Sequence, residues 1–316
     1  MRVQPTPLLL LLAVPFAAGL TGLGNDPARA GVPREEPFVV RPFRPYSGER
    51  WIGNAVAYGP HRDGQRPGGP EPSRAELRED LLLMLPHWNL LRLYGASGVA
   101  GTILELIRED ELDMKVMLGV WIAPEEQRDA EGRVVARDSV AAAANREEVA
   151  AAIRLAAEFP DLIVAVAVGN ETQVDWSAHR SPLDILIGYV REVRAAVSLP
   201  VTSVDDFKWW LEPESRSLAR EIDFVTMHAH PLWNGRQLEE GMAWMLEQVA
   251  AVQDLHADRE VVLGETGWAT SVADVGEQAT LIKGRVGEAE QKVFYDQVRA
   301  WADAERVTVF VFEAFD

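Results

Sequence analysis

The chain has 316 residues, of which 47% are hydrophobic and 25% charged, a composition typical of one large globular domain or two ordinary ones. Its formal net charge of -18 argues against nucleic acid and anionic membrane surfaces as partners, because both would repel it, whereas an uncharged polymer is compatible with it. The absence of cysteine excludes disulfides, zinc–thiolate sites and a cysteine nucleophile.

Residues 1–30 have the pattern of an export signal. Arg2 precedes an uncharged apolar stretch at residues 5–24, and Ala28-Arg29-Ala30 matches the small-x-small pattern of a signal-peptidase site. The stretch is nearly long enough to span a bilayer, but its prolines and glycines make a poor permanent helix. We expect a signal peptide, with membrane anchoring by residues 5–24 as the alternative, and in both cases an exported protein, periplasmic or extracellular. Residues 31–50, rich in proline and charge, are expected to form an extended lead-in.

From Trp51 onward, short apolar runs alternate with longer segments of helical period. The runs predict eight strands, at residues 51–57, 89–93, 115–121, 162–168, 200–204, 222–227, 260–264 and 307–312. Because these runs are continuously apolar rather than alternating, they indicate a parallel sheet whose outer face is covered.

Seven helices are predicted between the strands. Three have start signals: a capping box at Ser73–Glu76, the run Asn145–Glu148, and Pro182 at a first helical position. The other four are predicted at residues 97–108, 213–220, 238–254 and 290–306.

Eight βα units in residues 51–316 match the size of an α/β protein of the TIM (β/α)8 barrel type, with the eighth helix apparently missing. The alternative, a doubly wound open sheet, would need a GxGxxG turn after its first strand. The stretch "AYGPHRDGQRPGG" lacks that order of glycines.

Polar and aromatic residues gather at the predicted carboxyl ends of the strands, where a TIM barrel builds its active site. In chain order they are Tyr58, Arg92, Tyr94, Trp121, Asn170, Glu171, Asp205, Asp206, His228, His230, Glu265, Trp268, Glu313 and Asp316. Aromatic rings stack on sugar faces, and glycoside hydrolysis needs one protonated and one ionised carboxyl group. A single glutamate after a strand is more often a solvated loop residue or a helix cap. Glu171 and Glu265, each in a glycine-containing corner of strands 4 and 7, together favour chemistry.

The motifs "VAVGNET" and "VVLGETGWAT" resemble the two active-site signatures of family 17 glycoside hydrolases, the β-1,3-glucanase family in the clan of retaining TIM-barrel glycosidases. The resemblance covers nearly everything from Trp51 onward. It includes "YGPHRDGQ", "WNLLRLYG", "MLGVWIAPE", "HAHPLWNG" and "FVFEAFD" in family order, and "HPLWNG" is similar to the bacterial branch.

The resemblance implies a role for each matching residue. Glu171 would be the general acid/base, held protonated by a less solvated and negatively flanked site, and Glu265 the nucleophile that forms a glycosyl-enzyme intermediate. Arg92 or its neighbours would keep Glu265 ionised, Asn170 would bind the sugar 2-hydroxyl, and His230 would take the place of a strand-6 tyrosine. Further residues expected to line the cleft are Tyr58, Tyr94, Trp233 and Trp268, with Trp121, Trp176, Trp209 and Trp210 as weaker candidates. No cofactor, metal ion or protein partner is implied; the expected partner is a β-glucan oligo- or polysaccharide.

In the family, an acidic residue, an aromatic residue and a final helix follow strand 8, whereas this sequence stops at Asp316. We therefore expect part of the barrel wall to be uncovered unless another element covers it.

Three other functions remain open. Transglycosylation would use the same two glutamates, and the sequence does not choose between transfer and hydrolysis. A metal-dependent hydrolase could use His228 and His230, but metal barrels of that type usually place HxH after strand 1. A non-catalytic glucan-binding barrel would not need both glutamates. Linkage, chain length and endo or exo attack also stay open.

Overall fold

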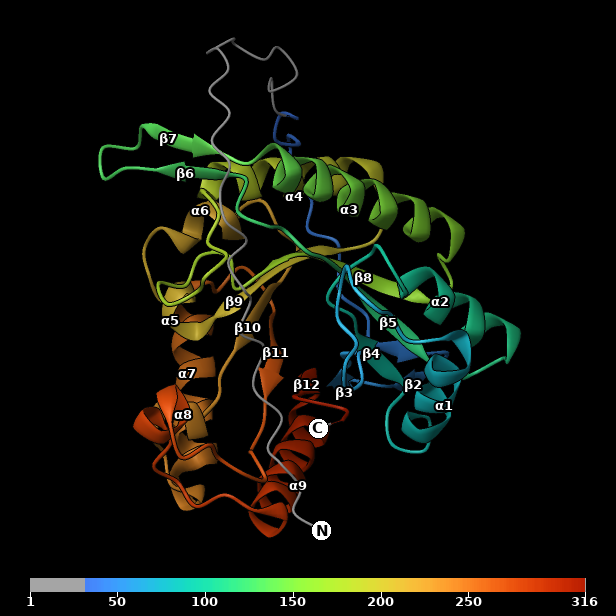
Figure 1. Cartoon of the computed structure of the whole chain (residues 1–316), viewed down its shortest axis with the longest axis vertical. Coiled ribbons are helices and arrows are strands. Elements are labelled where there is room, and N and C mark those ends of the chain that lie inside the picture. The colour runs from blue at the N-terminus through green and yellow to red at the C-terminus, as the bar shows by residue number, and fades with distance from the viewer. Residues whose placement is uncertain (1–31, 316) are drawn as a thin grey trace.

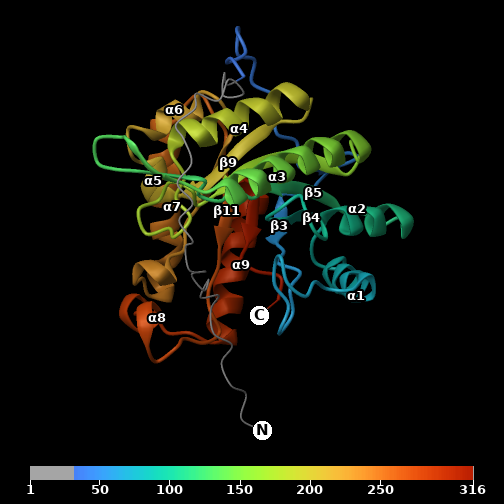
Figure 2. The ribbon, with the colours of Figure 1, turned by 45° about the horizontal axis from the view of Figure 1, so that its top comes forward.

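The computed structural model describes residues 32–315, so the predicted signal peptide or anchor at residues 1–30 lies outside the described residues, as does Asp316. Eight parallel strands close into a barrel in the order β10-β11-β12-β3-β4-β5-β8-β9, and helices surround them (Figures 1 and 2). The strands are β3 (Asn54–Ala57), β4 (Leu90–Arg92), β5 (Lys115–Val120), β8 (Ile163–Asn170), β9 (Val201–Asp206), β10 (Val225–His228), β11 (Val261–Thr266) and β12 (Val309–Val311). The predicted TIM barrel is confirmed.

The first predicted strand is shorter than expected because its start belongs to a separate hairpin. Trp51 lies in β2 (Arg50–Trp51), which pairs antiparallel with β1 (Tyr46–Ser47). The barrel strand β3 begins only at Asn54.

Two strands of the site run further than predicted, because parallel pairing continues into their polar ends. β8 extends to Asn170, which pairs with Val204 of β9, and β9 extends to Asp206, which pairs with His228 of β10. The β8–β9 register shifts between Ala167 and Asn170, but the pairing continues, so the polar side chains reach the rim on paired strands.

The helices that follow the strands are α1 (Arg74–Met84), α2 (Ala100–Glu109), α3 (Ser139–Glu158), α4 (Leu183–Ala196), α5 (Phe207–Trp210), α6 (Ser215–Ala219), α7 (Leu238–Leu255), α8 (Gly276–Leu281) and α9 (Glu288–Glu305). The helix predicted at 213–220 is the shorter α6, preceded by α5. The prediction did not include the antiparallel hairpin of β6 (Glu126–Arg128) and β7 (Val134–Arg137), which projects from the barrel in Figure 1.

The start predicted for the third helix at Asn145 is wrong. Asp138 caps α3 instead, because its carboxylate accepts hydrogen bonds from the backbone N–H groups of Val140 and Ala141. Asn145 is buried inside the helix, where its side-chain amide pairs with the backbone of Ala123.

The lead-in closes the amino-terminal end of the barrel. Phe43 is buried there, and its ring stacks on Phe224 with ring centroids 4.5 Å apart. The Arg41 guanidinium donates to the carbonyls of Val197 and Leu199, which lie between α4 and β9. The lead-in is therefore packed against the barrel at the end opposite the polar rim.

No helix follows β12 within residues 32–315. The wall that we expected to be uncovered is partly shielded by α9, which packs against both β12 and β3. Phe294, Val298 and Ala302 of α9 are buried in the apolar layer between barrel and helices. Within the same part of the chain, no helix combines the length and apolar character needed to cross a membrane.

Candidate active site

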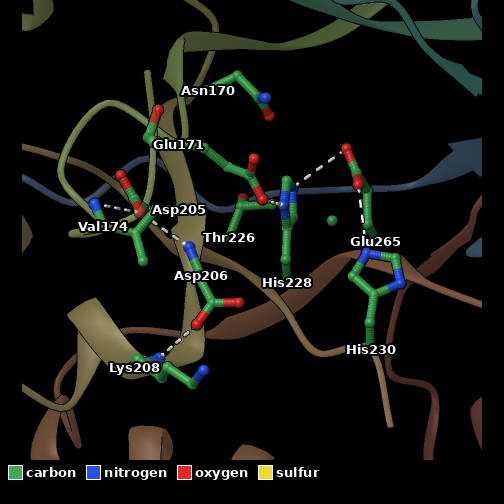
Figure 3. A network of polar contacts seen from close by, with 12 residues as sticks. Asn170, Glu171, Val174, Asp205, Asp206, Lys208, Thr226, His228, His230 and Glu265 are labelled. Carbon is green, nitrogen blue, oxygen red and sulfur yellow. Dashed lines mark hydrogen bonds and ion pairs between the residues drawn. The ribbon is translucent and has the colours of Figure 1, made fainter. Parts of the chain in front are cut away.

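Glu265 lies at the carboxyl end of β11 among several hydrogen-bond donors, of which Figure 3 shows His230. Its Oε1 accepts from Arg92 Nη1 at 2.7 Å and from the Tyr94 hydroxyl at 2.9 Å, and its Oε2 accepts from His230 Nε2 at 3.3 Å. Burial by itself raises the pKa of Glu265, but interaction with His228, the His230 hydrogen bond and the charge of Arg92 outweigh burial. The pKa therefore lies well below its usual range, and the carboxyl group is an anion.

Glu171 follows directly after β8 in a left-handed backbone conformation, with φ of +49°. Its Oε1 accepts a hydrogen bond from His228 Nδ1 at 3.0 Å. The same imidazole presents Nε2 3.4 Å from Oε1 of Glu265, without hydrogen-bond geometry. One buried histidine ring therefore lies between the two carboxyl groups that the sequence predicted as a pair.

Arg92 connects the second carboxylate to the residue that precedes the first. Its Nη2 donates to Oδ1 of Asn170, while Nη1 donates to Glu265. The planar guanidinium fork can hold two acceptors at once, which a lysine ammonium cannot do with the same geometry. The backbone carbonyl of Asn170 also accepts from His179 Nε2 at 2.7 Å. Arg92, Tyr94, Asn170 and His230 therefore all lie beside the two glutamates.

Tyr58 and Trp268 depart from the cleft lining that the resemblance implied. The Tyr58 hydroxyl donates to the Asp80 carboxylate of α1 at 2.8 Å, and the whole side chain is buried. The Trp268 indole donates to the carbonyl of Arg285 at 2.9 Å and packs on Phe294. Both rings are enclosed by the protein and leave almost no face for a sugar.

The other tryptophans divide by exposure. Trp233 and Trp121 are half-buried, and the Trp121 ring packs on His179 with centroids 4.7 Å apart. Trp176 is mostly exposed. Trp209 and Trp210 are buried, so these two weaker candidates belong to the core.

Three neighbours of the two glutamates were not assigned these positions from the sequence. His228 was considered only as a metal ligand, although its place at the end of strand 6 indicated that it faces the rim. Asp205 was noted at the end of strand 5, but its contacts with the loop after β8 depend on two distant segments. His179 lies in a loop and had no sequence signal.

Ligand atoms of His228, His230 and Glu265 lie within 4.8 Å of one another, a spacing that a metal ion could bridge. However, the Arg92 guanidinium already occupies Oε1 of Glu265 at 2.7 Å. A positive guanidinium at this oxygen opposes the binding of a second cation. The contacts therefore favour an ion-pair network over a metal centre.

Comparison with known proteins identifies the family. Residues 55–316 match the family model of the BtgE/BtgC glycoside hydrolase domain. The chain belongs to this family. The family resemblance inferred from the two glutamate motifs is therefore confirmed, and the protein is a glycoside hydrolase.

Two curated relatives illustrate the match. A glucan 1,3-beta-glucosidase of Arthroderma benhamiae is 24% identical over 260 residues, which are 80% of this chain and 77% of the relative. A probable glucan endo-1,3-beta-glucosidase of Aspergillus fumigatus is 24% identical over 265 residues, 78% of this chain. The matched region is 35% of that longer protein.

Two solved structures share the fold of this glycoside hydrolase. An endo-laminarinase from Formosa Hel1_33_131 superposes with a TM-score of 0.68 at 24% identity, covering 84% of this chain and 79% of the other. A β-1,3-glucanosyltransferase from Rhizomucor miehei superposes with a TM-score of 0.65 at 18% identity, covering 83% and 86%.

Proposed function

We propose that the protein acts on β-1,3-linked glucan by a retaining mechanism, with Glu265 as nucleophile and Glu171 as general acid/base. The observation that carries this proposal is the pair of carboxyl groups on either side of His228, of which Glu265 alone is hydrogen-bonded to an arginine. The names of the curated relatives, glucan 1,3-beta-glucosidase and glucan endo-1,3-beta-glucosidase, support the linkage.

The first step uses the anionic state of Glu265. Its carboxylate oxygen attacks the anomeric carbon, the glycosidic C–O bond breaks, and Glu171 transfers its proton to the departing oxygen. Arg92, Tyr94 and His230 donate to the Glu265 oxygens, which keeps that carboxylate ionised and oriented before attack.

The second step uses the greater exposure of Glu171. Its side chain is 19% exposed, against 8% for Glu265, so the expectation of a less solvated acid/base is wrong. Contact with solvent suits the second half of the reaction, in which Glu171 removes a proton from an incoming hydroxyl as that oxygen replaces Glu265 at the anomeric carbon.

Transfer to another glucan chain is the second candidate function. It requires only that a sugar hydroxyl, rather than water, enters in the second step. The fold is shared with both a laminarinase and a glucanosyltransferase, so both outcomes belong in the test.

The test is incubation with β-1,3-glucan oligosaccharides, comparing wild type with Glu171→Gln and Glu265→Gln and identifying products by linkage. We expect the first variant to lose about 10²–10⁴-fold in turnover, the range for removal of a general acid/base, and the second to fall to background. Shorter products alone indicate hydrolysis, whereas longer or branched ones indicate transfer.

Three results would overturn the proposal. Unchanged turnover in either variant would refute the role given to that glutamate. Loss of wild-type activity in EDTA, with Glu265→Gln still active, would replace the glycosidase mechanism by metal-dependent hydrolysis. Wild-type binding of glucan without any turnover would support a non-catalytic binding barrel.

Export is proposed from the sequence alone. Amino-terminal sequencing of the exported protein is expected to begin at Gly31, after Ala28-Arg29-Ala30. An intact amino terminus in the membrane fraction would instead indicate anchoring by residues 5–24.

A further inference from the structure

The turn that carries Glu171 has an unfavourable backbone. Glu171 itself adopts φ of +49°, directly after Gly169 at +77° and Asn170. A left-handed conformation is disfavoured for a residue with a side chain, so surrounding contacts must hold it. Two backbone hydrogen bonds contribute: Glu171 N–H donates to the carbonyl of Val204 at 2.9 Å, and Ser181 N–H donates to that of Thr172 at 3.0 Å.

Asp205 supplies the side-chain contacts that complete this support. Its Oδ2 accepts from Gln173 N–H at 2.8 Å, and its Oδ1 accepts from Val174 N–H at 3.1 Å and from Asp206 N–H at 2.9 Å. Figure 3 shows this carboxylate beside Val174, on the opposite side of the Glu171 carboxyl group from Glu265. One side chain therefore joins the end of β9 to two successive amides of the turn after β8.

Burial makes the position of this carboxylate unfavourable for its charged form. Asp205 is 1% exposed, and all its hydrogen-bond donors are backbone N–H groups. Burial raises the pKa of Asp205 to about 7, the bonds from Gln173 and Asp206 oppose that rise, and the negative charge of Glu171 adds to it. Perturbed pKa values cluster at functional sites, which makes this buried carboxyl group beside Glu171 a candidate for a functional role.

We infer that Asp205 is a positioning residue for the acid/base Glu171, holding the turn after β8 so that the Glu171 carboxyl group reaches the departing oxygen. The inference rests on the function proposed above. Both oxygens of Asp205 are needed, because Gln173 and Val174 donate to different ones. In Asp205→Asn, one oxygen becomes an NH2 group that faces an N–H donor. The hydrogen bond at that position is lost, while the volume of the side chain hardly changes.

The test separates proton donation from nucleophilic attack. A dinitrophenyl β-glycoside of laminaribiose has a leaving group that departs without a proton, whereas an ordinary laminari-oligosaccharide needs one. The quantity compared is kcat/KM, which reports the steps up to departure of the leaving group and is independent of the later use of Glu171 as a base.

For Asp205→Asn we expect kcat/KM to fall between about tenfold and a hundredfold on the oligosaccharide, the size of effect seen for displaced catalytic groups. On the dinitrophenyl glycoside it should stay within about threefold of wild type. Titration of Glu265 with a slow 2-fluoro glycoside counts the folded sites, so partial unfolding does not enter the ratio. Asp205→Glu, which keeps both oxygens and the charge, is the second variant in case Asp205→Asn fails to fold, and it should recover part of the oligosaccharide activity.

A matched control lies at the opposite end of the barrel. Asp223 is also buried and accepts from a backbone N–H group, that of Val201 at the start of β9, at 2.8 Å. Asp223→Asn should lower the melting temperature but affect both substrates equally. Equal losses on both substrates for Asp205→Asn would overturn the inference and leave Asp205 a purely structural residue.

Glu171→Gln distinguishes failure of the positioning role of Asp205 from failure of the proposed function. If Glu171→Gln itself shows no preference for the dinitrophenyl glycoside, the acid/base assignment fails. If Glu171→Gln shows the preference and Asp205→Asn does not, only the positioning role of Asp205 is refuted.

Discussion

At the scale of single residues, the site contains side chains that each contact two other residues of the site. His228 lies between Glu171 and Glu265, and Arg92 connects Glu265 to Asn170. Each shared contact fixes two segments of the barrel relative to one another, so the two carboxyl groups are oriented before substrate arrives. Such preorganisation is how an enzyme lowers the barrier without rearranging in the transition state.

The His230–Glu265 pair is expected to stabilise the fold with a bell-shaped dependence on pH. The pKa of Glu265 is lowered from 4.5, so its stabilising contribution is present above pH 4.5 and is lost as the pH falls through the folded-state value. For His230, burial lowers the pKa, but the hydrogen bond and charge of Glu265 outweigh burial and raise it above 6.5. Its contribution is complete below pH 6.5 and is lost as the pH rises through the folded-state value.

We therefore expect the pair to stabilise the fold most between about pH 4.5 and 6.5. In His230→Gln, the loss of stability on the alkaline side should be smaller than in wild type, because the titrating partner is gone. Melting temperatures measured across pH 4 to 9 check this expectation. An alkaline slope identical in both proteins would show that His230 does not titrate against Glu265.

At the scale of elements, local signals located most helices but misplaced the start of α3. The segment from Asp138 to Glu148 contains two capping patterns separated by a run of alanines. Alanine favours helix, so the helix continues back through that run to the earlier cap at Asp138. Asn145 is instead held inside the helix by the backbone of Ala123, a contact that the local pattern does not contain.

Asp138→Ala is expected to lower the free energy of unfolding by about 0.5–2 kcal/mol, because two amides of the first turn of α3 lose their acceptor. Catalytic constants should not change, since Asp138 caps a surface helix. Denaturant unfolding gives the free energy, with Asp138→Asn as the control that retains a capping oxygen. A midpoint equal to wild type in the alanine variant would show that the cap contributes nothing.

At the scale of the whole molecule, the barrel is closed at one end by a segment that precedes it in sequence. The lead-in places Phe43 on Phe224 and Arg41 on the carbonyls after α4. The polar rim with Glu171 and Glu265 lies at the other end of the strands. Stability and chemistry are therefore separated along the barrel axis, as in other TIM barrels.

Phe43→Ala should lower the free energy of unfolding by about 3–5 kcal/mol, the range for removal of a buried aromatic ring. Turnover at a temperature where the variant stays folded should be unchanged. Val39→Ala is the matched control, because Val39 lies in the same segment but is exposed. If both variants unfold at the same denaturant concentration, the lead-in does not act as a barrel closure.

The sequence by itself determined the order of eight buried strands and the two glutamates at the ends of β8 and β11. Continuous apolar runs report burial on both faces, and the residue after such a run must reach the rim. Only the tertiary structure decided which of the predicted aromatic rings are buried. Tyr58 is buried and donates a hydrogen bond to Asp80, and Trp268 is buried and donates one to the carbonyl of Arg285. A local sequence motif does not indicate either partner. The position of His228 between the two glutamates also could not be predicted from a local motif. It depends on contacts between residues that are far apart in the chain.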